Sequence, residues 1–254
     1  MADDSGVGDA ASVEVVLTQD RPDLERATEE AFRERWPEFI FHDAVSKAHL
    51  PRVQEYFRHY DILLLDEGEV AAGGWGVPFA WDGTVEDLPG GYDGGLVRAV
   101  EGHEQGRRAD TFSFMAAAVA LAYDKQGLAA EVLAELTARA RAEGLERVIA
   151  PIRPTWKSRY PTVPMSEYAG WVREDGLSID PWIRTHQRLG GTILGPAAES
   201  MLIEGTVAEW EEWTGMLFPA SGDYVVPDAL NLVHVDREAD RVVYREENLW
   251  VRHR

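Results

Sequence analysis

The chain has 254 residues, of which 45% are hydrophobic, enough to build the core of one large domain or two small ones. Its net charge of −20 disfavours nucleic acid as a partner, because phosphate contacts need clustered Lys and Arg. The absence of cysteine excludes disulfides, thiolate metal sites and a cysteine nucleophile, and we expect no bound metal.

The N-terminal half predicts alternating strands and helices. Residues 1–12 are small, polar and acidic, so we expect a disordered tail there. No apolar run reaches the length of a membrane span, which favours a cytoplasmic protein without membrane contact. The expected elements are a strand at Val13–Leu17, helices at Pro22–Trp36 and Asp43–Tyr60, a hairpin at Asp61–Val77, a long Gly-rich loop at Asp82–Gly95 and a strand at Thr111–Ala120.

The segment from Ala116 to Ala150 joins a strand, a tight polar turn and an amphipathic helix, with no linker residues between them. The helix, Gly127 to about Glu143, has one apolar stripe, and Gly144 follows it at the expected C-terminal position. The first N–H groups of a helix lack intrahelical partners and carry partial positive charge. We therefore predict a main-chain cradle for a phosphate, formed by Lys125, Gln126, Gly127, Leu128 and Ala129.

The C-terminal half begins with a buried strand at Arg147–Ile152. An aromatic-rich stretch at 155–177 follows, and then a helix that Asp180 caps, with Pro181 at its first position. Beyond Thr206 we expect a short helix at Trp210–Trp213 and a hairpin of Ala229–Val235 with Arg241–Val251. This tail is open to three roles: completing the sheet, pairing with another subunit, or forming a lid.

Two segments resemble motifs of the GNAT superfamily of N-acetyltransferases. Ala118, Val119, Tyr123, Gly127 and Ala129 match the acyl-CoA-binding motif, in which a strand ends in Ala-Val and a Gln/Arg-x-x-Gly-x-Gly/Ala turn enters a helix. The chain departs from that motif at its first position, where Asp124 replaces Gln or Arg. A carboxylate there repels a pyrophosphate unless it turns outward, and the adjacent Lys125 is positioned to restore positive potential.

The second match is the segment from Ser178 to Leu194, which contains the Leu189-Gly190 pair of the family's following helix and strand. His186 stands where the family commonly has a Tyr thought to protonate the departing CoA. A histidine suits that chemistry because its pKa lies near neutrality. The alternative is a half-buried helix residue held by a carbonyl, and a single histidine does not decide between them.

The resemblance implies an α/β fold with a mixed, mostly antiparallel central sheet, splayed fourth and fifth strands and flanking helices. We expect a single domain at 13–254, with a core at 13–206, an insertion at 155–177 and a C-terminal hairpin extension at 207–254. The insertion would lie over the acceptor side of the cleft, where its aromatic and basic side chains frame a substrate or, alternatively, form an ordinary packed loop or dimer contact.

The function implied is acetyl-CoA-dependent N-acetylation of a small-molecule amine by direct attack on the thioester, without a metal. Another acyl-CoA as the donor and a peptide or protein as the acceptor are the alternatives. The oxyanion donor would be the N–H near Val119, where the family has a β-bulge. For a base, only the weak candidates Glu101, His103 and Asp110 precede the central strand, each with surface solvation as the alternative. The rival interpretation is a non-catalytic module that binds acyl-CoA as a sensor or partner subunit, and a homodimer is compatible with either.

Overall fold

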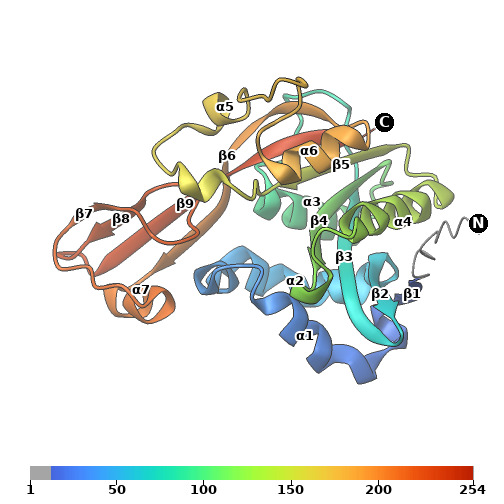
Figure 1. Cartoon of the computed structure of the whole chain (residues 1–254), viewed down its shortest axis with the longest axis horizontal. Coiled ribbons are helices and arrows are strands. Elements are labelled where there is room, and N and C mark those ends of the chain that lie inside the picture. Colours follow the sequence, from blue (N-terminus) through green and yellow to red (C-terminus); the bar gives the residue numbers. More distant parts are fainter. Residues whose placement is uncertain (1–12, 254) are drawn as a thin grey trace, which may run out of the picture.

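One open sheet organises the chain, in a computed structural model that describes residues 13–253 (Figure 1). The expected tail at 1–12 lies outside the described residues. The strands are β1 (Glu14–Leu17), β2 (Asp61–Asp66), β3 (Glu69–Phe79), β4 (Thr111–Val119), β5 (Arg147–Ile152), β6 (Thr192–Gly205), β7 (Gly222–Tyr224), β8 (Val233–Asp236) and β9 (Arg241–His253). The helices are α1 (Glu25–Arg33), α2 (Ala44–Tyr56), α3 (Tyr92–Glu104), α4 (Leu128–Ala142), α5 (Met165–Tyr168), α6 (Pro181–Arg188) and α7 (Val207–Thr214).

The strands follow the order β1-β2-β3-β4-β5-β9-β8-β7, and β6 pairs with the other edge of β9. Among the paired strands of the described chain, only β4 and β5 run parallel. This mixed, mostly antiparallel sheet with flanking helices confirms the expected fold class. No helix within residues 13–253 has the length and apolarity needed to cross a membrane.

Two adjacent glycines of β3 show which helices cover which face. A Cβ at Gly73 would touch Phe32 of α1, and a Cβ at Gly74 would lie 2.6 Å from Val132 of α4. Successive strand residues face opposite sides of a sheet, so α1 and α4 cover opposite faces. Helix α3 shares the face of α1, because Tyr92 of α3 packs edge-on against Trp75, two residues after Gly73.

The chain after Thr206 supplies an interior part of the sheet. Strand β9 pairs with β5 through Leu249–His253 and with β6 along most of its length. Its first half also pairs with β8, and this wing lies with α7 on the left side of Figure 1. The wing and α7 pack around Trp210, Phe218 and Tyr244. Of the three roles open to the tail, the structure shows that it completes the sheet.

The segment predicted as a long loop, Asp82–Gly95, ends in the first turn of a helix. Helix α3 begins at Tyr92 and continues to Glu104 despite three glycines in its sequence. Leu96, Ala99 and Val100 are buried on its inner face, so tertiary packing stabilises a helix that the glycines disfavour. This helix carries residues of the site described below.

Candidate functional site

The segment predicted as a phosphate cradle, Lys125 to Ala129, is a turn of unpaired N–H groups, and we keep the name cradle for it. After the short 3₁₀ turn Leu121–Tyr123, Lys125 and Gly127 adopt positive φ angles of 65° and 88°, and Gly127 becomes the N-cap of α4. Leu128 and Ala129 open the helix and therefore have no intrahelical acceptor. Within the described residues, no hydrogen bond takes its proton from the backbone N–H of Lys125, Gln126 or Gly127.

The cradle lies at the open end of a gap between β4 and β5. The two strands pair only through Thr111–Ser113 and Arg147–Ile149, whereas β4 continues to Val119. The backbone N–H of Ala120 donates to the Ala71 carbonyl at 2.9 Å, so by alternation the N–H groups of Ala117 and Val119 point away from β3. Both groups face the gap.

A β-bulge interrupts β4 upstream of the expected place. The register with β3 shifts between Trp75 and Gly76, which face Ala116 and Phe114, so Met115 is the extra residue. The expectation of a bulge near Val119 is therefore wrong, because the bulge lies at Met115, four residues earlier in the strand. The gap-facing N–H of Val119 arises from strand alternation instead.

The unusual Asp124 is paired with an arginine from a distant part of the chain. Arg35, just beyond α1, donates to Asp124 Oδ1 at 2.6 Å, and its side chain is 23% exposed against 47% for Asp124. Arg35 Nε is buried without an acceptor in the described residues. The ion pair neutralises the carboxylate and brings a guanidinium to the edge of the cradle.

His186 lies fully buried on α6, with Nδ1 2.7 Å from Nε2 of His253 on β9. Burial and the second ring lower the pKa of His186 well below its usual value, so the ring is neutral at pH 7. Its Nε2 has no partner among the described residues. His253 also contacts Phe114, the first β4 residue beyond the β5 pairing, which places the histidine pair near the start of the gap.

The sequence interpretation missed a buried pair of carboxyl groups. Asp43 caps α2 by accepting from the Ser46 N–H at 2.5 Å, and Asp93 accepts from the Leu202 N–H of β6 at 3.2 Å. Asp43 is fully buried and Asp93 partly exposed. Burial, followed by the charge of Asp43, raises the pKa of Asp93 to about 8. The pair therefore retains a proton at neutral pH.

A polar network continues from this pair across β6 and β9. The Tyr92 N–H donates to Ser200 Oγ, the Ser200 hydroxyl donates to Asn248 Oδ1, and the Asn248 amide donates to Glu246. Glu246 is buried but pairs with Arg153 at 3.0 Å. Tyr92, at the start of this network, packs edge-on against Trp75, which pairs with Ala116 next to the bulge of β4. The network therefore reaches the sheet face beside the bulge.

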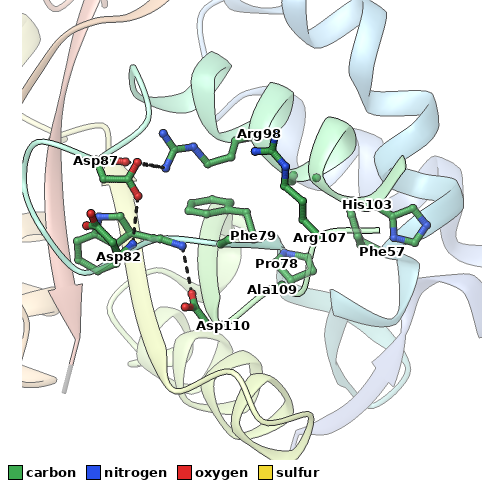
Figure 2. Close-up of a pocket in the computed structure, with 14 residues that line it drawn as sticks. Phe57, Pro78, Phe79, Asp82, Asp87, Arg98, His103, Arg107, Ala109 and Asp110 are labelled. Atoms are coloured by element: carbon green, nitrogen blue, oxygen red, sulfur yellow. Dashed lines mark hydrogen bonds and ion pairs between the residues drawn. The ribbon is translucent and has the colours of Figure 1, made fainter. Parts of the chain in front are cut away.

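The three weak base candidates lie elsewhere. Glu101 and His103 are exposed on the C-terminal half of α3, and Asp110 pairs with Arg147 at 3.0 Å. His103 and Asp110 border a hollow of about 480 Å³ at the N-terminal end of β4, opposite the cradle (Figure 2). These residues lie at one end of β4 and the cradle lies at the other end, so their side chains do not reach the gap.

Side chains of the aromatic stretch at 155–177 pack against one another and form hydrogen bonds to other parts of the chain. Tyr160, Tyr168 and Trp171 pack on one another, and the buried Tyr168 hydroxyl donates to Asp180 at 2.8 Å. Asp180 caps α6 as expected. Lys157 is fully buried and donates to two backbone carbonyls. These contacts favour the packed-loop alternative for these residues.

Known proteins show both sequence and fold similarity to this chain. It is 32% identical to an arginine N-acetyltransferase, avaD, of Aspergillus versicolor, over 86% of this chain and 84% of that protein. The fold resembles the loading GNATL domain of CurA from Lyngbya majuscula (TM-score 0.54, 16% identity, 92% of this chain and 96% of that one). It also resembles the GphF GNAT-like decarboxylase solved with isobutyryl-CoA (TM-score 0.56, 16% identity, 95% and 98%). No family model matches the sequence.

The pKa of Asp93 gives a testable dependence of stability on pH. Because its folded-state pKa lies above the ordinary 3.8, the folded protein holds a proton that the unfolded chain has lost, and stability falls as pH rises through about 8. We expect thermal melts between pH 6.5 and 9 to show this fall in the native protein and a flatter profile in Asp93→Asn. Glu101→Gln, an exposed change on the same helix, is the control. Parallel profiles for native protein and Asp93→Asn would contradict the assignment.

Proposed function

The chain belongs to the GNAT superfamily of N-acetyltransferases, and we propose that it transfers an acetyl group from acetyl-CoA to the amino group of a small cationic molecule such as arginine. The observation that carries this proposal is the set of unpaired N–H groups at the start of α4, which opens into the gap between β4 and β5. The 32% identity to an arginine N-acetyltransferase supports the choice of acceptor.

In the proposed complex, the diphosphate of acetyl-CoA accepts from the N–H groups of Lys125, Gln126, Gly127, Leu128 and Ala129. The pantetheine arm lies along β4, and the thioester carbonyl accepts from the N–H of Val119 as negative charge develops on its oxygen. The acceptor approaches from the face of α2 and α3. Its ammonium group first loses one proton to solvent. The neutral nitrogen then bonds to the carbonyl carbon and loses a second proton to solvent, while the carbon–sulfur bond breaks and the sulfur takes up one proton from solvent.

We assign His186 a narrower role than proton donation. Proton donation at pH 7 needs an imidazolium, and the lowered pKa of His186 makes that form scarce. The unpartnered Nε2 supports a hydrogen bond from the neutral ring to the leaving sulfur, with His253 holding the other nitrogen. This arrangement stabilises the thiolate without transferring a proton from the ring.

The function is tested by incubating the purified chain with acetyl-CoA and L-arginine and measuring free thiol. We expect thiol release that depends on both reactants, together with a mass increase of arginine by one acetyl group. L-lysine, agmatine and a neutral amine complete the panel of acceptors. If acetyl-CoA binds but no amine releases thiol, the non-catalytic acyl-CoA-binding module replaces the enzyme as the function.

Two interpretations of the Arg35–Asp124 pair predict opposite effects of Asp124→Asn on the affinity for acetyl-CoA. If Asp124 positions Arg35 against the diphosphate, Arg35→Ala and Asp124→Asn both weaken acetyl-CoA binding, Arg35→Ala by about tenfold, the size of a charge-assisted contact. If Asp124 only repels the diphosphate, Asp124→Asn tightens binding. Calorimetric titration decides, with Arg33→Ala, a change in an exposed arginine two residues away, as the control.

For His186, replacement by Phe should leave the dissociation constant of acetyl-CoA unchanged and lower kcat by about tenfold, the effect of one lost hydrogen bond to developing charge. Because the neutral ring acts, the native kcat profile should show no limb near pH 6.5 that His186→Phe removes. Steady-state kinetics over pH 5.5–9 measure both effects, with thermal melts to confirm folding. An unchanged kcat would remove His186 from the mechanism.

A further inference from the structure

The carboxyl pair of Asp43 and Asp93 has an unusual electrostatic environment. Oδ2 of each residue accepts a backbone N–H, whereas Oδ1 of each is buried and has no donor among the described residues. The two carboxyl groups lie within hydrogen-bonding reach of each other. Two such groups cannot both ionise without a compensating charge, so the unliganded pair shares a proton.

No basic side chain of the described residues compensates this pair. Neither residue takes part in the salt bridges of residues 13–253, whereas the neighbouring Glu246 is neutralised by Arg153. The groups of the described residues that interact with the pair include the Ser46 N–H of α2, the Leu202 N–H of β6, the Glu246 carboxylate of β9 and the Tyr92 hydroxyl of α3. Each is neutral or negative, so the site is electrostatically incomplete without a proton or an external cation.

The position of the pair connects this property to the reaction. Asp43 precedes α2 and Asp93 lies in the first turn of α3, on the sheet face opposite α4. The adjacent Tyr92 contacts Trp75, which faces the bulge of β4. Asp93 is partly exposed, so the pair lies under the surface on the side of the sheet from which the proposed acceptor approaches.

We propose that Asp43 and Asp93 bind a cationic nitrogen of the acceptor, an ammonium or guanidinium group, in place of their shared proton. This inference rests on the proposed function and names the residues that select a cationic acceptor. On binding, the cation donates hydrogen bonds to the two Oδ1 atoms, both carboxyl groups ionise, and the shared proton leaves to solvent. In this step the O–H bond of the protonated carboxyl group breaks, its proton passes to water or buffer, and the hydrogen bonds from the cation take its place.

Asparagine variants separate binding from folding. Asn at either position keeps an oxygen that accepts the same backbone N–H, and its amide hydrogen replaces the shared proton. The fold should therefore survive Asp43→Asn and Asp93→Asn, which thermal melts check. What each variant loses is the negative charge that a cation requires.

The test is calorimetric titration of L-arginine into the full chain saturated with CoA at pH 7, in phosphate and in Tris. The difference in heat between the buffers measures proton release, because Tris takes up protons with a larger heat. We expect the native protein to release up to one proton per arginine, and each Asn variant to bind at least about tenfold more weakly without release. Glu101→Gln should behave as the native protein.

Failure of this inference is distinguishable from failure of the function. If the native protein acetylates arginine and both Asn variants bind it with the native dissociation constant, the pair is structural and the function stands. If the native protein turns over no arginine, the proposed acceptor fails, and methylammonium and methylguanidinium become the probes. A shift of the Asp93 carboxyl resonance in the native protein by either cation would then support the site, and no shift would overturn it.

Discussion

The separation of β4 from β5 after three residue pairs is the constraint on which the site depends. Parallel strands that stayed paired would consume the backbone groups of Ala117 and Val119 and leave no room between them. Because β5 leaves β4 after Ile149, while its other edge stays paired with β9, the second half of β4 keeps one edge without a strand partner. The turn that follows β4 then delivers the start of α4, with its unsatisfied N–H groups, to the end of this open edge.

Charges around the gap are distributed according to the same architecture. At the start of α4, main-chain donors and the Arg35 guanidinium, which reaches Asp124 from beyond the end of α1, favour an anion. Beside α2 and α3, buried carboxyl groups without a basic partner favour a cation. In the proposed reaction between an anionic acyl carrier and a cationic amine, each reactant then enters where the local charge attracts it. The chain's excess of acidic residues is thus informative only through the few that are buried.

Features that depend on local sequence were predictable, and those that depend on distant contacts were not. The strand, turn and helix around Gly127 follow from periodicity and backbone preference within about 30 residues, as does the cap at Asp180. The helix α3 was missed because its glycines argue against it, and packing on α2, β3 and β6 stabilises it. Asp43 begins a helix predicted from the sequence and Asp93 lies in a predicted loop, 50 positions further on, so no local pattern pairs them. The partner of Asp124, 89 positions away, was equally inaccessible.

The central claim is that the open edge of β4 and the start of α4 form an acyl-CoA site. Calorimetric titration of the full chain with acetyl-CoA, beside S-acetylpantetheine, which lacks the diphosphate and nucleotide, tests it most directly. The account predicts saturable binding of one acetyl-CoA per chain and much weaker binding of the fragment, because the cradle holds the diphosphate. Absence of acetyl-CoA binding, or equal affinity for the fragment, would contradict it.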